Sequence, residues 1–134
     1  MKFDHIGIFV SDLKFGFDHI SKIIGIKKFS KIHYDNNHRV KVQFLFDKDN
    51  ICFEIVAPHG IDNPVDDLLK SKKNLLNHIA YRVDDMEESI QIFKENNCLQ
   101  ITDLLPAVAF KDAPVTFFFS PLGFIIELIG TAKK

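Results

Sequence analysis

Apolar and polar residues alternate along residues 2–10, and this two-residue period predicts a β-strand. Ser11 and Asp12 follow the strand as candidate helix caps. Apolar residues then recur every three or four positions, which predicts an amphipathic helix that ends at Gly25. The apolar stripe of this helix consists of Leu13, Phe17, Ile20 and Ile24.

A hairpin is expected after the helix. Residues 40–46 and 51–56 both have strand patterns, and the polar residues 47–50 between them predict the turn. Residues 29–34 predict a further short strand. The first half of the chain is therefore expected to have the order strand, helix, strand, strand, strand.

The same order recurs in the second half when the chain is shifted by 73 residues. Strands are expected at residues 77–83, 115–119 and 124–129, and Asp84 and Asp85 are candidate helix caps. A second helical stripe, which matches the first, consists of Met86, Ile90 and Phe93.

These elements predict an α+β fold in a single domain. Two paired βαβββ modules, residues 1–56 and 77–134, are joined by a linker, residues 57–76, in which residues 65–71 predict a short helix. Neither module could bury one face of its sheet alone. The two modules are therefore expected to form one curved mixed sheet around a cleft, with the helices outside.

One histidine and one glutamate occupy matching positions in the two halves. Glu54 lies 49 residues after His5, and Glu127 lies 49 residues after His78. Alternate side chains share one face of a strand, so all four should project from the face opposite the helices. Burying an unpaired carboxylate in a segment as apolar as that around Glu127 would cost several kcal/mol. A lone strand histidine or glutamate is usually structural, but four at matching positions predict a metal site.

The predicted ligand set is two imidazoles and two carboxylates. This set suits borderline divalent ions such as Ni²⁺, Co²⁺, Zn²⁺, Mn²⁺ or Fe²⁺. With four protein ligands, a six-coordinate ion would keep two positions open, as catalytic metal sites do. Arg82 lies four residues after His78, on the same face, so we expect it to bind a substrate anion or to form a salt bridge. Surface roles are expected for the remaining histidines, which are His19, His33, His38 and His59.

Composition limits the other functions. The chain has 134 residues with 17 basic and 18 acidic side chains, so no excess of positive charge indicates a nucleic-acid partner. The N-terminal residues enter a strand pattern directly, without the apolar run of a signal peptide, and no apolar run is long enough to cross a membrane. A cytoplasmic protein without a membrane partner is expected. Cys52 and Cys98 are expected to be reduced thiols.

The segments Asp-His-Ile-Gly-Ile (4–8), Phe-Glu-Ile-Val-Ala-Pro (53–58) and Asn-His-Ile-Ala-Tyr-Arg-Val-Asp-Asp (77–85) resemble the vicinal oxygen chelate superfamily. So does Gly-Phe-Ile-Ile-Glu-Leu (123–128). The resemblance extends over essentially the whole chain and is strongest to the branch that holds glyoxalase I and methylmalonyl-CoA epimerase. It implies paired βαβββ modules around a divalent metal, with the ligands at His5, Glu54, His78 and Glu127.

The resemblance also implies a reaction. A metal-bound carbonyl would favour removal of the neighbouring α-proton, with Glu127 as base and ligand and Glu54 as its counterpart on the other side. Gln43 and Thr116 occupy matching positions one strand earlier and are candidates for substrate contacts or for structural hydrogen bonds. Phenylalanines at matching positions, expected to pack against the helices, are Phe44, Phe46, Phe117 and Phe119.

Four functions follow from the resemblance. The first is an isomerase or epimerase of an acyl thioester, similar to methylmalonyl-CoA epimerase. The second is glyoxalase I (lactoylglutathione lyase), but Phe9 and Pro58 replace two residues that hold glutathione in bacterial members. The third is a non-enzymatic small-molecule binder, and the fourth is an extradiol dioxygenase, whose site would need only one carboxylate. The resemblance allows a site within one chain or a site shared in a homodimer.

Overall fold

The computed structural model describes residues 1–60, 63, 65–72 and 75–132. The chain divides into two compact units. The first unit is His5–Asn77, and the second unit comprises Met1–Asp4 together with His78–Lys134. The boundary falls inside the first strand, β1 (Lys2–Phe9), so this strand contributes residues to both units.

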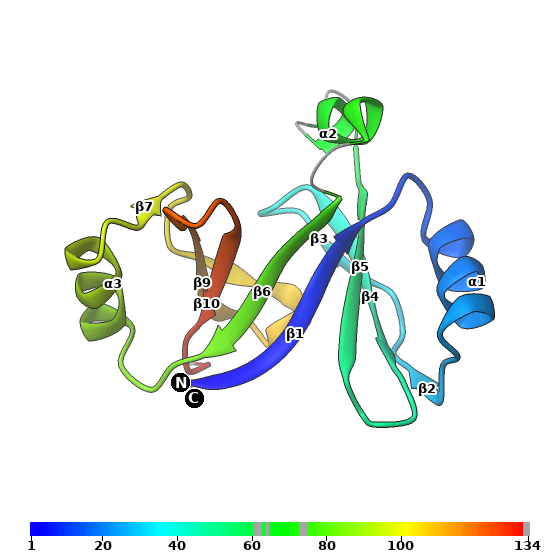
Figure 1. The fold of residues 1–134 in the computed structure, drawn as a ribbon, viewed down its shortest axis with the longest axis horizontal. Helices are drawn as coiled ribbons and strands as arrows, with labels where there is room; N and C mark the ends of the chain where they lie inside the picture. Colours follow the sequence, from blue (N-terminus) through cyan, green and yellow to red (C-terminus); the bar gives the residue numbers. More distant parts are fainter. Residues whose placement is uncertain (61–62, 64, 73–74, 133–134) are drawn as a thin grey trace. The chain divides into compact units, whose positions relative to one another are not determined.

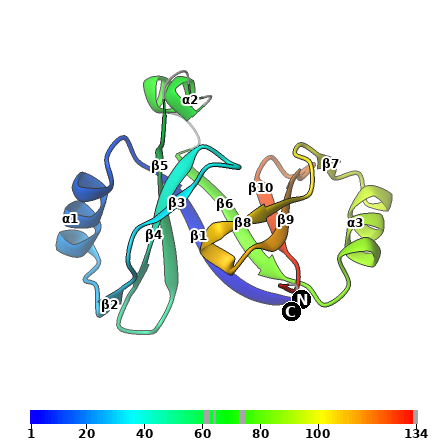
Figure 2. The same cartoon turned by 180° about the vertical axis from the view of Figure 1, so that it is seen from behind.

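The first unit contains a mixed sheet with the strand order β2-β4-β5-β1, and β3 pairs with β4 (Figures 1 and 2). β1 and β5 are parallel, whereas the pairs that β4 forms are antiparallel. The elements that follow β1 in this unit are α1 (Leu13–Ile23), β2 (Lys28–Phe29), β3 (His33–Asp35), β4 (Val40–Phe46), β5 (Cys52–Pro58) and α2 (Val65–Ser71).

Helix α1 begins as the apolar pattern predicts, and Leu13, Phe17 and Ile20 of its stripe pack on the sheet, whereas Ile24 follows the helix end and is 49% exposed. The Asp12 carboxylate accepts a hydrogen bond from the backbone N–H of Phe15 at 2.9 Å, which satisfies one of the free donors of the first turn. Gly25, with a φ of +88°, follows the helix end in the left-handed region that glycine adopts without strain. The buried residues between α1 and the sheet are Leu13, Ile20, Leu45, Ile55 and Ala57.

The second unit repeats this architecture. Its sheet has the strand order β6-β10-β9-β7, and β8 pairs with β9. β6 and β10 are parallel, and β9 is antiparallel to β10, β7 and β8. The elements are β6 (Leu76–Arg82), α3 (Met86–Glu95), β7 (Leu99–Gln100), β8 (Leu105–Ala107), the 3₁₀ turn η1 (Val108–Phe110), β9 (Ala113–Phe119) and β10 (Ile125–Ile129).

Helix α3 is the counterpart of α1. The Asp85 carboxylate caps it by accepting a hydrogen bond from the backbone N–H of Glu88 at 3.0 Å. Its stripe packs on the sheet, where the rings of Phe93 and Phe118 meet at 5.1 Å with an edge-on geometry. The buried residues of this core are Val83, Phe118 and Leu128, and the partly buried residues packed on them include Met86, Ile90 and Phe93.

The observed elements confirm the α+β class, the mixed sheet and the expected helices. The strand expected at residues 29–34 is interrupted: β2 ends at Phe29 and β3 begins at His33. At the interruption, the Ser30 hydroxyl accepts a hydrogen bond from the backbone N–H of Phe44, and the Ser30 carbonyl accepts one from the Gln43 side-chain amide. Part of the expected linker, including residues 61–62, lies outside the described residues. Among the helices described, none is both long and apolar enough to span a membrane.

Candidate metal-binding site

In the first unit, the sheet register places His5 and Glu54 on one face. Gly7 of β1 lies beside Glu54 of β5, and His5 is two residues before Gly7, so all three share a face. The His5 Nε2 atom lies 3.4 Å from a carboxylate oxygen of Glu54. Both residues are buried, with exposed fractions of 0% for His5 and 6% for Glu54. Ile8 and Ile55, on the other face, belong to the core against α1, as the alternation predicts.

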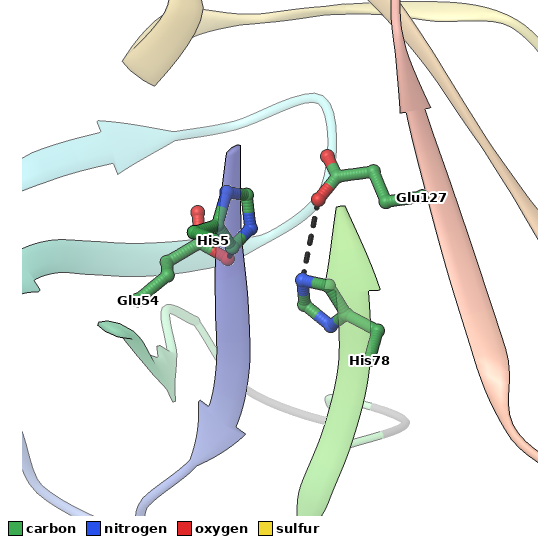
Figure 3. A group of neighbouring side chains, drawn as sticks. All are labelled: His5, Glu54, His78 and Glu127. Atoms are coloured by element: carbon green, nitrogen blue, oxygen red, sulfur yellow. Dashed lines mark ion pairs between the residues drawn. The ribbon is translucent and has the colours of Figure 1, made fainter. Parts of the chain in front are cut away.

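The second unit holds an equivalent pair. Glu127 of β10 lies beside Ala80 of β6, two residues after His78, so His78 and Glu127 share a face. The His78 Nε2 atom lies 3.2 Å from a Glu127 carboxylate oxygen, the contact drawn as a dashed line in Figure 3. His78 is 5% exposed and Glu127 is 3% exposed. The expectation that both residues project from the face opposite the helix is met in each unit.

The spacing within each pair fits a shared cation. Two ligand atoms that each lie about 2.1 Å from one ion are separated by about 3.0–3.4 Å at octahedral or tetrahedral angles. The two imidazole–carboxylate distances are 3.4 and 3.2 Å. Imidazole nitrogen and carboxylate oxygen are donors that Zn²⁺, Ni²⁺, Co²⁺ and Mn²⁺ accept. The same distances also suit an imidazole–carboxylate contact without a metal.

Two phenylalanines flank these pairs, contrary to expectation. Phe44 is opposite Glu54 in the sheet, and its ring meets the His5 ring at 5.8 Å with an edge-on geometry. Phe117 is opposite Glu127, and its ring meets the His78 ring at 5.5 Å. The expectation that both phenylalanines belong to the helix-facing core is therefore wrong. Leu45 and Phe118 occupy the core positions. Phe44 packs against His5, and Phe117 packs against His78.

The cause of this error is the length of the hairpin connection. A four-residue turn at 47–50 would place Phe46 opposite Ile51, but Phe46 pairs with Cys52, so the connection has five residues. The Asp47 carboxylate accepts hydrogen bonds from the backbone N–H groups of Asp49 and Ile51, both at 2.9 Å. One extra residue moves every side chain of one strand to the other face relative to its partner.

The same register shift corrects the expectation for Gln43 and Thr116 as substrate contacts. Gln43 pairs with Ile55 and Thr116 pairs with Leu128, so both lie on the helix-facing side of their sheets. Gln43 donates its side-chain amide to the Ser30 carbonyl at 2.9 Å. Thr116 is fully buried, donates to the Thr102 carbonyl at 3.0 Å and accepts from the Gln100 amide at 2.9 Å. Both residues therefore hold neighbouring segments on the sheet.

Arg82 forms the salt bridge that was one of its two expected roles. Its Nε atom donates to the Asp4 carboxylate at 2.7 Å, and its guanidinium lies 5.5 Å from the centre of the Phe110 ring. The Arg82 side chain remains 48% exposed. The bond to Asp4 and the contact between the rings of Phe3 and Tyr81 hold the N-terminal residues against β6 within the second unit.

His33, which sequence analysis assigned to the surface, lies on the same face as Glu54. It is opposite Val42, two residues before Phe44, and its ring meets the Phe44 ring at 5.9 Å. Partial burial and the nearby Lys31 ammonium lower the pKa of His33 below its ordinary value, while the Glu54 carboxylate opposes this shift. The alternation of β3 was too short to reveal the placement, because a strand of three residues gives little periodicity.

Comparison with known proteins identifies the family. The family model of the Glyoxalase/Bleomycin resistance protein/Dioxygenase superfamily matches residues 4–117, which include three of the four candidate ligands. The chain belongs to this superfamily. The expected vicinal oxygen chelate resemblance is thereby confirmed, and this superfamily contains enzymes as well as a resistance protein, as its name states.

Individual relatives share the fold at low sequence identity. The protein YqjC of Bacillus subtilis, described as uncharacterized, is 26% identical over 131 residues, which cover 95% of this chain and 90% of YqjC. A hypothetical protein from Bacillus halodurans has a TM-score of 0.81 at 26% identity, with 99% of this chain and 96% of that protein covered. Methylmalonyl-CoA epimerase from Mycobacterium tuberculosis has a TM-score of 0.76 at 17% identity, with coverage of 98% and 89%.

The structural role of Thr116 can be tested by Thr116→Val. Loss of the hydroxyl would leave the Thr102 carbonyl and the Gln100 amide without this buried partner. The free energy of unfolding, measured by urea denaturation, should fall by about 1–3 kcal/mol. The matched control is Thr131→Val at an exposed threonine, which should change it by less than about 0.5 kcal/mol. Equal effects of the two substitutions would contradict the assignment.

The electrostatic setting of His33 predicts opposite effects of two charge removals. Glu54→Gln should lower the pKa of His33 further, and Lys31→Gln should raise it, as measured by NMR titration of the imidazole in metal-free protein. The pKa of His33 is lower in the folded chain than in the unfolded chain, where it is about 6.5, so the unfolded chain binds more protons between these two values. The contribution of His33 to stability is therefore lost as the pH falls through this window. A rise of the His33 pKa in Glu54→Gln would refute the proposed coupling.

Proposed function

We propose that His5, Glu54, His78 and Glu127 together bind one divalent metal ion, and that the protein is an isomerase or epimerase of an acyl thioester, most like methylmalonyl-CoA epimerase. The observation that carries the proposal is the presence of two buried imidazole–carboxylate pairs with ligand spacing. Each of the four side chains offers one ligand atom, either a histidine nitrogen or a carboxylate oxygen.

Ligand number and chain connectivity both favour a single ion that the two pairs share. One histidine and one carboxylate are fewer protein ligands than tight sites for these metals have. His5 directly follows Asp4, which is bonded to Arg82 of β6, the strand that also carries His78. The internal repeat gives both pairs the same local geometry, and two equivalent halves of a site can complete each other.

The chemistry divides between the ion and the two glutamates. When bound, the ion would supply a Lewis acid that stabilises negative charge on the substrate carbonyl oxygen. Glu127 is the proposed base, and its carboxylate takes the proton from the α-carbon. Glu54, its counterpart in the repeat, returns a proton to the opposite side of that carbon, so no atom is gained or lost and the configuration inverts. The Phe44 and Phe117 rings pack against the buried histidines and would help to position them.

The similarity to methylmalonyl-CoA epimerase supports the fold, and residue chemistry supports the choice of reaction. Glutathione as a co-substrate is disfavoured by Phe9 and Pro58, which offer no side-chain charge or hydrogen bond. Arg82 is proposed as a contact for a substrate anion because half of its side chain is exposed. The proposed partner is therefore a small anionic thioester.

The reaction is tested by deuterium incorporation at the α-carbon of methylmalonyl-CoA in D₂O, followed by NMR with Co²⁺ or Ni²⁺ added to metal-free protein. Exchange should require the metal, and Glu127→Gln should reduce its rate at least 100-fold, as expected for loss of a general base (about 10²–10⁴). The matched control is Glu95→Gln at an exposed glutamate of α3, which should retain the full rate.

A fully active Glu127→Gln protein would eliminate Glu127 as the base. Exchange that proceeds equally well without metal would refute the Lewis-acid role. If methylmalonyl-CoA shows no exchange with any metal while methylglyoxal and glutathione are converted, the lyase function replaces the epimerase function.

A further inference from the structure

The face of the first unit that carries Glu54 also carries His33 at its edge. His33 pairs with Val42 of β4, and Phe44, two residues further along β4, pairs with Glu54. The Phe44 ring contacts the His33 ring at 5.9 Å and the His5 ring at 5.8 Å. His33 is partly exposed, whereas His5 and Glu54 are buried. A molecule that reaches the buried pair across Phe44 would therefore meet the His33 imidazole.

This imidazole breaks the internal symmetry of the chain. Val42 of the first unit corresponds to Val115 of the second after the 73-residue shift. Val42 pairs with His33, but Val115 pairs with Leu105. Equivalent sheet positions thus hold a polar ring near Glu54 and an apolar side chain near Glu127. Packing requirements that recur in both halves do not explain a polar residue in only one of them.

The charges around His33 favour an anion. The Lys31 ammonium lies close enough to influence the imidazole. Asp35, the acidic residue of β3, accepts hydrogen bonds from the backbone N–H groups of Asn37 and His38. The second oxygen of its carboxylate lies 3.0 Å from His38 Nδ1. The Asp35 carboxylate is therefore used within the β3–β4 turn. The His33 imidazole N–H can donate a hydrogen bond to a carboxylate of a bound molecule. This bond, with the nearby Lys31 ammonium, would offset the repulsion between that carboxylate and Glu54.

We propose that His33 is a specificity-determining residue that hydrogen-bonds a carboxylate on the acyl group of the substrate, on the Glu54 side of the site. This inference deepens the proposed function and depends on it, because it requires an acyl thioester to bind at the four-ligand site. It assigns the polar substituent of the acyl group to the face of the first unit that carries Glu54 and His33.

The test compares two ligands that differ only at this group. Methylmalonyl-CoA carries a carboxylate where isobutyryl-CoA carries a methyl group. Calorimetric titration of the Co²⁺-loaded chain should show tighter binding of methylmalonyl-CoA. His33→Ala should reduce the ratio of the two dissociation constants about tenfold, the effect of losing a hydrogen bond to a charged group, and His33→Gln should restore part of it. His19→Ala, at an exposed histidine of α1, is the matched control and should leave the ratio unchanged.

The contrary outcomes distinguish a failure of the His33 role from a failure of the proposed function. If both thioesters bind and His33→Ala leaves their ratio unchanged, His33 has no role in selecting the acyl group, and the proposed function stands. The same conclusion follows if wild-type protein does not prefer the carboxylate. If neither thioester binds while Co²⁺ does, both the acyl thioester substrate and the role of His33 are overturned.

Discussion

The burial of two carboxylates is the constraint on which the rest of the structure depends. Glu54 and Glu127 lie inside apolar strands, where an uncompensated charge would cost several kcal/mol. Each has one histidine within 3.4 Å, and each histidine makes a T-shaped contact with a phenylalanine ring. The proposed divalent cation would compensate both carboxylates with one ion, using one ligand atom from each of the four side chains. The proposed activity is a consequence of this compensation.

Strand register is what brings these groups together within each unit. The connections between β4 and β5 and between β9 and β10 both have five residues, with Phe46 paired to Cys52 and Phe119 paired to Ile125. The fourth residue of each connection, Asn50 or Gly123, has a positive φ, and these two residues occupy matching positions of the repeat. This connection places a phenylalanine opposite each glutamate. It also places the polar residue before that phenylalanine on the helix side, where Gln43 and Thr116 form internal hydrogen bonds.

The sequence predicted those features that depend on periodicity within one segment. The caps Asp12 and Asp85, the helical stripes, and the alternation that separates His5 from Ile6 and Ile8 all have local causes. Features that depend on pairing between segments were missed, because a turn of four or five residues looks similar in sequence but reverses the faces of its strands. His33 was missed for another reason: β3 has only three residues, too few to show a period, so its position became visible only through its pairing with Val42.

The central claim is that the two pairs bind a single ion jointly, and metal stoichiometry tests it most directly. Co²⁺ bound per chain is measured by equilibrium dialysis and elemental analysis for wild-type protein, His5→Ala and His78→Ala, with folding checked by circular dichroism. We expect one ion per wild-type chain. Binding should fall strongly in both variants, because each substitution removes a ligand from the same ion. Two ions per wild-type chain, or undiminished binding of one ion after either substitution, would contradict it.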